Sequence, residues 1–265
     1  MKKFMGKLLL VVTAFTLFLI QTTFIQAQEI NKEEGVVIGF DDTFAPFGFK
    51  NAEGDYVGFD LDLAEEILGR LEVDYEFQPI DWSMKETELN TGNIDMIWNG
   101  YSVTPEREEI VQFSDPYIKN RQVIIVKADS DIQNKSDFEG KIVATQEQSA
   151  SLEAIMSDED FAATIDGQQP ITYATFVEVF SDLDNGRADG IVVDELLATY
   201  FLEQQGNASD YRILEDNFGE EDYAVGFRKD DQEFVEEFNE VLAEIIEDGT
   251  FDEIKSQWFT EVEGE

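Results

Sequence analysis

Short apolar runs alternate with segments of helical spacing in the first half of the chain. Runs at residues 36–40, 75–77 and 94–98 are bounded by polar loops, which predicts buried strands. Asp60 can cap a helix that continues through residue 71, and residues 84–89 have helical spacing before a glycine. Strands that alternate with helices predict an α/β layer with a mostly parallel sheet.

The second half of the chain repeats this plan. Apolar runs at residues 123–126, 142–145 and 190–193 predict three further strands. Helices are expected to start near Ser151 and to span residues 176–183, which end at an Asn-Gly pair. The pattern therefore predicts a second α/β layer.

Polar residues follow several of the predicted strands. In the first layer they occupy residues 41–44, Asp81 with its neighbour Trp82, and residues 99–102. In the second layer they occupy residues 146–149 and Asp194. Ligands of α/β sheets usually bind beyond the carboxyl ends of the strands, so we expect these loops to meet at a binding site.

One arginine stands out because it follows a small polar turn. Residues 98–107 read Trp-Asn-Gly-Tyr-Ser-Val-Thr-Pro-Glu-Arg, which places Arg107 shortly after Gly100 and Ser102. A guanidinium group can hold a carboxylate with two parallel hydrogen bonds. The alternative is that Arg107 pairs with neighbouring glutamates on a solvated surface. The residues alone leave both interpretations open.

Composition removes several kinds of chemistry. The chain has 265 residues, 43% of them hydrophobic, with no Cys and no His. This excludes catalysis by Cys–His or Ser–His–Asp groups, thiolate or imidazole metal sites, and disulfides. We expect no metal and no cofactor. The formal net charge of −41 also argues against nucleic acid and anionic membrane surfaces as partners.

The amino terminus has the pattern of a secretion signal. A basic end precedes an apolar run at residues 8–20, and Ala27 is a plausible cleavage site. We therefore expect residues 1–27 to be a signal peptide and the protein to be exported to the periplasm or the cell surface. An uncleaved anchor is the alternative. No Cys follows the run to carry a lipid.

Several segments, in this order, carry a family resemblance. They are residues 44–47, 58–64, 94–107, 113–117, 185–190, Asp194 and 248–251. Together they resemble bacterial extracellular solute-binding proteins of polar amino-acid ABC importers, the family-3 type. The resemblance extends from about residue 36 to residue 259.

The resemblance implies a two-lobed fold of the type II periplasmic-binding-protein class. Each lobe would be a mostly parallel sheet flanked by helices, and a hinge of two chain crossings would join the lobes. Lobe one would comprise residues 29–120 and 223–265, and lobe two residues 121–222. The crossings would lie near residues 120–123 and 217–224.

The resemblance also implies roles for residues that would hold the amino-acid backbone. Arg107 would clamp the α-carboxylate. The carbonyl oxygen of Gly100 and the hydroxyl of Ser102 would accept hydrogen bonds from the α-ammonium group. Asp194, on the other lobe, would complete that ammonium site with its charge.

A second set of residues would surround the ligand side chain. Phe44 would lie against its apolar stem and Trp82 would form another wall. Asp41 corresponds to a position that touches polar or cationic side chains in relatives. Asn99 would line the same region.

One loop departs from the family pattern. Relatives usually have a Gly and two Ser/Thr residues where this chain has Gln148, Ser149 and Ala150. Ser149 keeps one hydroxyl, and the backbone amides of Ser149 and Ala150 can still bind a carboxylate at a helix N-terminus. We expect all three residues to contact the ligand.

The implied function is capture of a free amino acid for delivery to an ABC permease with its ATPase. We expect a monomer and no enzymatic activity. A dehydratase-like enzyme and a ligand-sensing domain remain alternatives. Arg107 is the only evident pocket cation, whereas Asp41, Asp81 and Glu147 are nearby acids, which disfavours glutamate and aspartate. A polar solute such as glutamine or cystine is expected first, and basic amino acids second.

Overall fold

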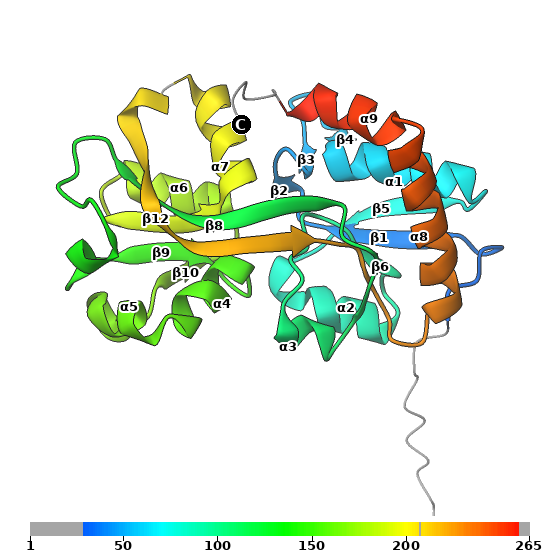
Figure 1. Cartoon of the computed structure of the whole chain (residues 1–265), viewed down its shortest axis with the longest axis horizontal. Coiled ribbons are helices and arrows are strands. Elements are labelled where there is room, and N and C mark those ends of the chain that lie inside the picture. Colours follow the sequence, from blue (N-terminus) through cyan, green and yellow to red (C-terminus); the bar gives the residue numbers. More distant parts are fainter. Residues whose placement is uncertain (1–28, 207, 260–265) are drawn as a thin grey trace, which may run out of the picture.

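The computed structural model describes residues 29–206 and 208–259. The expected signal peptide therefore lies outside the described residues. Two lobes stand side by side, each built on its own sheet, and two long strands run between them (Figure 1). Within the described residues, no helix is long and apolar enough to cross a membrane.

The sheet of lobe one has the strand order β5-β1-β6-β13-β7. Its strands are β1 (Val36–Phe40), β5 (Tyr75–Pro79), β6 (Met96–Ile97), β7 (Gln112–Phe113) and β13 (Gly226–Phe227). β1 pairs in parallel with β5 and β6, and β13 pairs antiparallel with β6 and β7. A small antiparallel sheet stands beside it, formed by β2 (Thr43–Phe44), β3 (Gly48–Lys50) and β4 (Tyr56–Val57).

The sheet of lobe two has the strand order β10-β9-β11-β8-β12. Its strands are β8 (Ile118–Lys127), β9 (Val143–Gln146), β10 (Ile171–Tyr173), β11 (Gly190–Asp194) and β12 (Tyr211–Tyr223). β9 pairs in parallel with β10 and β11, while β8 pairs antiparallel with β11 and β12.

In each sheet four of the five strands run in one direction and a single strand, β13 in lobe one and β8 in lobe two, runs against them, so the expected two-lobed fold with mostly parallel sheets is confirmed. The antiparallel pairings involve the segments in which the chain passes from one lobe to the other. β8 enters lobe two after β7, and β13 returns to lobe one after β12.

Helices flank both sheets and bury an apolar face against them. In lobe one they are α1 (Phe59–Arg70), α2 (Lys85–Thr91), α3 (Pro105–Glu108), α8 (Gln232–Glu247) and α9 (Thr250–Trp258). In lobe two they are α4 (Ala150–Ser157), α5 (Glu159–Thr164), α6 (Phe176–Asp184) and α7 (Glu195–Gln205). On α8, for example, Phe234, Phe238 and Leu242 follow helical spacing and are buried.

Asp60 does not cap α1. Gly58 is the N-cap residue, and Asp60 lies inside the first helical turn with its side chain buried. Its carboxylate accepts a hydrogen bond of 2.6 Å from the Gly100 backbone N–H and one of 2.9 Å from the Tyr117 hydroxyl. Burial raises the pKa of Asp60 to about 7. The carboxylate thus fixes the loop that follows β6.

β8 and β12 are the long strands that run between the lobes (Figure 1). They pair antiparallel from Tyr223 opposite Ile118 to Tyr211 opposite Lys127, with two irregularities in the register. Tyr223 also forms an isolated bridge with Ser102 of lobe one. The first predicted crossing, residues 120–123, lies in β8, and the second, residues 217–224, extends one residue beyond the end of β12. The crossings and the lobe boundaries stay predictions.

Candidate functional site

Loops at the strand ends meet between the lobes, as the polar residues after the strands predict. In lobe one, the backbone N–H of Asp41 donates to Asn99 Oδ1 at 3.0 Å. The Trp82 ring lies edge-on to Tyr101, with 5.8 Å between ring centroids. The three predicted loops of lobe one therefore border a single region.

Arg107 is buried at this region rather than solvated. Arg107 is 3% exposed and its guanidinium carbon lies 4.7 Å from the centre of the Tyr101 ring. Nη1 donates to the Ser102 carbonyl at 3.0 Å. Nη2 donates to the Gln148 carbonyl at 3.4 Å and lies 3.2 Å from Glu153 Oε1.

The anionic partner of Arg107 therefore comes from lobe two. Glu153 lies on α4, and it replaces the neighbouring glutamates that the sequence offered as partners. Arg107 Nε has no hydrogen-bond partner among the described residues. The guanidinium thus joins the lobes, and its Nε–H is available to a further acceptor.

Lys85 is a second buried cation beside Arg107, which corrects the expectation of a single one. Its side chain is 1% exposed, and Nζ donates to the Gln148 carbonyl across the lobe interface at 2.8 Å. Nζ also lies 3.2 Å from Glu86 Oε1 and 5.0 Å from the centre of the Trp82 ring. Burial, and secondarily the positive Arg107, lower the pKa of Lys85 to about 8.

The loop before α4 presents a carbonyl oxygen to these two cations. Gln148 has φ 52, a left-handed conformation that glycine adopts more easily. Ser149 is the N-cap residue of α4: its hydroxyl accepts from Leu152 N–H at 3.2 Å and donates to the Gln146 carbonyl at 2.7 Å. The hydroxyl proton of Ser149 is thus already used within the loop. Ala150 is buried at the first position of α4.

Asp194 ends β11 and points toward the hinge strands. Asp194 is the N-cap residue of α7, but its side chain makes no cap hydrogen bond with that helix. Oδ1 accepts from Asn120 Nδ2 at 3.0 Å, from Gln122 Nε2 at 2.7 Å, and from the Tyr223 hydroxyl. Burial raises the pKa of Asp194.

Sequence reasoning missed the residues that surround Asp194. Asn120 and Gln122 lie on β8, and Glu221 and Tyr223 on β12. Each pair is spaced by two, the strand period that places side chains on one face. This alternation of polar residues along both strands is the sequence signal that could have indicated these residues as neighbours of Asp194.

Gly100 lies between the aromatic rings of both hinge and pocket. Its φ is +56, and a Cβ atom would lie 2.7 Å from Phe44 Cε1 and 2.9 Å from Tyr223 Cε2. Only glycine satisfies both constraints without a shift of the neighbours. Ser102, two residues later, is buried beside Tyr223.

Asp41 lies at the lobe interface and is 6% exposed. Oδ1 accepts from the backbone N–H and hydroxyl of Thr43 at 2.9 and 2.6 Å. Oδ2 accepts from Gln146 Nε2, on lobe two, at 2.8 Å. Burial raises the pKa of Asp41, although these hydrogen bonds counteract the rise. Asn99 Nδ2, on the neighbouring loop, has no partner among the described residues.

Aromatic side chains close the same region. Phe44 is 6% exposed and packs across the interface on Phe176, with ring centroids 5.9 Å apart. Trp82 is 7% exposed. Trp98, which we assign to packing, lies against Phe238 in the core of lobe one. The predicted pocket residues thus come from both lobes and are largely shielded from water.

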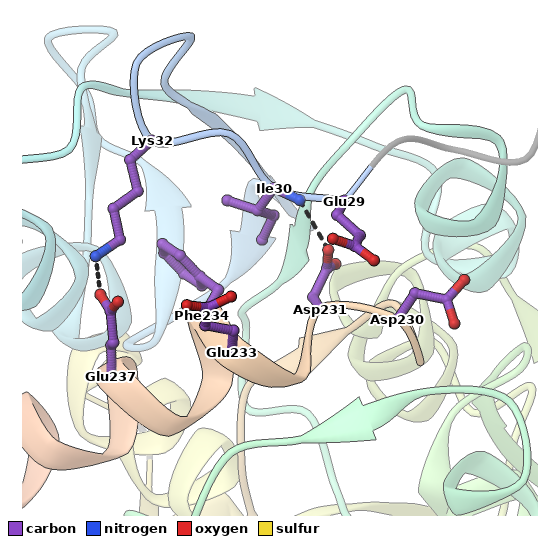
Figure 2. Close-up of a pocket in the computed structure, with 8 residues that line it drawn as sticks. All are labelled: Glu29, Ile30, Lys32, Asp230, Asp231, Glu233, Phe234 and Glu237. Carbon is purple, nitrogen blue, oxygen red and sulfur yellow. Dashed lines mark hydrogen bonds and ion pairs between the residues drawn. The ribbon is translucent and has the colours of Figure 1, made fainter.

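A separate surface pocket is lined by none of the residues described above. Figure 2 shows that it is formed by the first described residues and the start of α8. Ile30 N–H donates to Asp231 Oδ1 at 2.9 Å, and Lys32 pairs with Glu237. These contacts fasten the amino-terminal segment to α8.

The family description "Bacterial extracellular solute-binding proteins, family 3" matches residues 36–261. This chain belongs to that family. It is 33% identical over 232 residues to the lysine/arginine/ornithine-binding periplasmic protein of Escherichia coli, which covers 85% of this chain and 88% of that protein. This solute-binding protein therefore has the general role of an amino-acid-binding component of an ABC transporter.

Solved structures support the same conclusion about this solute-binding protein. A substrate-binding protein from Streptococcus pneumoniae with bound histidine matches with TM-score 0.84 and 39% identity, over 86% of this chain and 93% of that one. An ancestral arginine-binding protein with arginine matches with TM-score 0.80 and 35% identity, over 87% and 100%. These relatives are binding proteins rather than enzymes.

Proposed function

We propose that this solute-binding protein captures a basic amino acid between its lobes and delivers it to a permease with its ATPase. The relatives named above are described as binding lysine, arginine, ornithine or histidine. This favours a basic solute over the glutamine- or cystine-like solute that the sequence places first.

The observation that carries the proposal is the buried carboxylate of Asp41. A buried charge is costly unless it meets a partner of opposite charge. Gln146 and Thr43 supply neutral donors to it. The guanidinium, ammonium or imidazolium group of a basic ligand would add the positive charge.

The backbone of the ligand would meet opposite charges on opposite lobes. Arg107 on lobe one would hold the α-carboxylate, with Lys85 adding positive charge nearby. Asp194 on lobe two would hold the α-ammonium group. A zwitterion that binds both would favour the state in which the lobes touch, because it stabilises that state alone.

Calorimetry of the mature protein with arginine, lysine, histidine, glutamine, cystine and glutamate tests the proposal. We expect a basic amino acid to bind most tightly. Arg107→Ala should abolish binding, while Arg70→Ala, an arginine on α1 that pairs with Glu66 and Asp248, should not. Tighter binding of glutamine or glutamate than of every basic amino acid would overturn the choice of solute.

A second variant tests the side-chain end of the site. Asp41→Asn keeps the shape of the side chain and removes its charge. Loss of a charge-assisted hydrogen bond is worth about 1.5–3 kcal/mol, so the affinity for a basic ligand should fall roughly 10- to 150-fold. The affinity for glutamine should change much less. Equal losses for both ligands would show that Asp41 does not recognise the charge.

A further inference from the structure

The proposed ammonium site contains two carboxyl groups, those of Asp194 and Glu221. Asp194 ends β11 and Glu221 lies on the hinge strand β12, and the side-chain nitrogens of Asn120 and Gln122 each contact one oxygen of both carboxyl groups. Asp194 is buried and Glu221 is partly buried. Two ionised carboxylates that share the same donors repel each other and offer only acceptors, so one proton between them relieves the repulsion.

The same two amide groups donate to both carboxyl groups. Asn120 Nδ2 lies 3.0 Å from Asp194 Oδ1 and 2.6 Å from Glu221 Oε1. Gln122 Nε2 lies 2.7 Å from each of these oxygens. A side-chain NH₂ group has two protons, so each amide is fully used by the pair.

The orientation of these amides is fixed by what their oxygens accept. Asn120 Oδ1 accepts from the backbone N–H of Leu196 at 3.3 Å, so the NH₂ group must face the carboxyl groups. Gln122 Oε1 accepts from the Ser151 hydroxyl on α4. The amide network therefore runs from the carboxyl pair to the helix that contacts Arg107.

The surroundings favour one shared proton over two charges. Burial raises the pKa of both carboxyl groups, and the Asp194 carboxyl further raises the pKa of Glu221. Tyr223 donates its hydroxyl to Asp194, and burial holds the pKa of that hydroxyl well above its usual value. The charged groups on the adjoining elements are themselves paired: Arg121 with Glu195, and Lys119 with Asp222.

We propose that Glu221 is a further binding residue, and that Asp194 and Glu221 share a proton which the α-ammonium group of the amino acid replaces. Binding then breaks one O–H bond and releases the proton to water. The ammonium group, which keeps its three protons, donates to both carboxylates and to the Gly100 carbonyl. This inference rests on the proposed function, since it needs an amino acid as the ligand.

Calorimetry in buffers of different ionisation enthalpy counts the protons released. With arginine at pH 6, we expect about one proton per ligand for the wild-type protein. Affinity should rise about tenfold per pH unit while the pair still holds its proton. In Glu221→Gln the pair has no proton to share, so we expect close to zero protons released and a flat pH profile.

The neighbour Glu220 provides the matched control. It is exposed on the same strand, so Glu220→Gln should release the same number of protons as the wild type. Arginine binding by the wild type without proton release at pH 6 would overturn the inference alone, even if Glu221→Gln failed to fold. Failure of every amino acid to bind would overturn the proposed function as well.

Discussion

Replacing Lys85 by Met removes a buried charge that touches both lobes. The pKa of Lys85 falls from 10.5 to about 8 in the folded protein, with burial as the main cause. One pKa unit corresponds to about 1.4 kcal/mol, so the burial of the charged form costs about 3 kcal/mol. Between pH 8 and 10.5 the unfolded chain still holds the proton and the folded protein does not. Stability therefore rises with pH across this window.

Denaturant unfolding at pH 7 and pH 10.5, followed by tryptophan fluorescence, measures the effect. The wild type should gain about 3 kcal/mol relative to Lys85→Met between the two pH values. Lys119→Met is the control: this side chain is 73% exposed and the nearby Asp222 raises its pKa, so no gain is expected in the window. If wild type and Lys85→Met changed in parallel, the burial of a charged Lys85 would be refuted.

Two further substitutions test the contacts of the site. Glu153→Gln removes a partly exposed carboxylate from Arg107, and since such pairs are worth at most about 1 kcal/mol, calorimetry should show an affinity gain of up to about fivefold; weaker binding would contradict this competition. Gly100→Ala places a methyl group 2.7 Å from a carbon of Phe44 at a φ of +56, so thermal unfolding should reveal a loss of roughly 1–3 kcal/mol. An unchanged midpoint for that variant would mean that the neighbouring rings yield without cost.

The sequence predicts the positions of several site residues because they depend on local patterns. Asp41, Asn99 and Asp194 each follow a strand whose apolar run is visible in the sequence. Parallel strands end at the same edge of a sheet, so the meeting of such loops follows from the fold class. The family pattern then links them to Arg107 and to a second lobe.

Other features depend on contacts between distant segments and could not be predicted. Lys85 begins a helix whose sequence pattern predicts a solvated surface, but its ammonium group lies over the Trp82 ring and donates to Gln148 of the other lobe. Glu221 meets Asp194 because β12 and β11 both flank β8 in the sheet. Asp is a common helix N-cap residue, but Gly58 is the N-cap residue of α1. The Asp60 carboxylate instead accepts a hydrogen bond from the Gly100 backbone N–H.

The burial of the proposed site residues predicts a limit on how fast a solute can be captured. The exposed fractions are 3% for Arg107, 4% for Asp194 and 6% for Asp41. Solutes in solution therefore cannot reach these residues while the lobes touch. Productive encounters are limited to the fraction of molecules whose lobes are apart, and the apparent dissociation constant is the intrinsic one divided by that fraction. At high solute concentration the capture rate should therefore level off at the rate of lobe opening. The contacts that Gln148 and Glu153 make across the interface would then set the maximum rate of uptake.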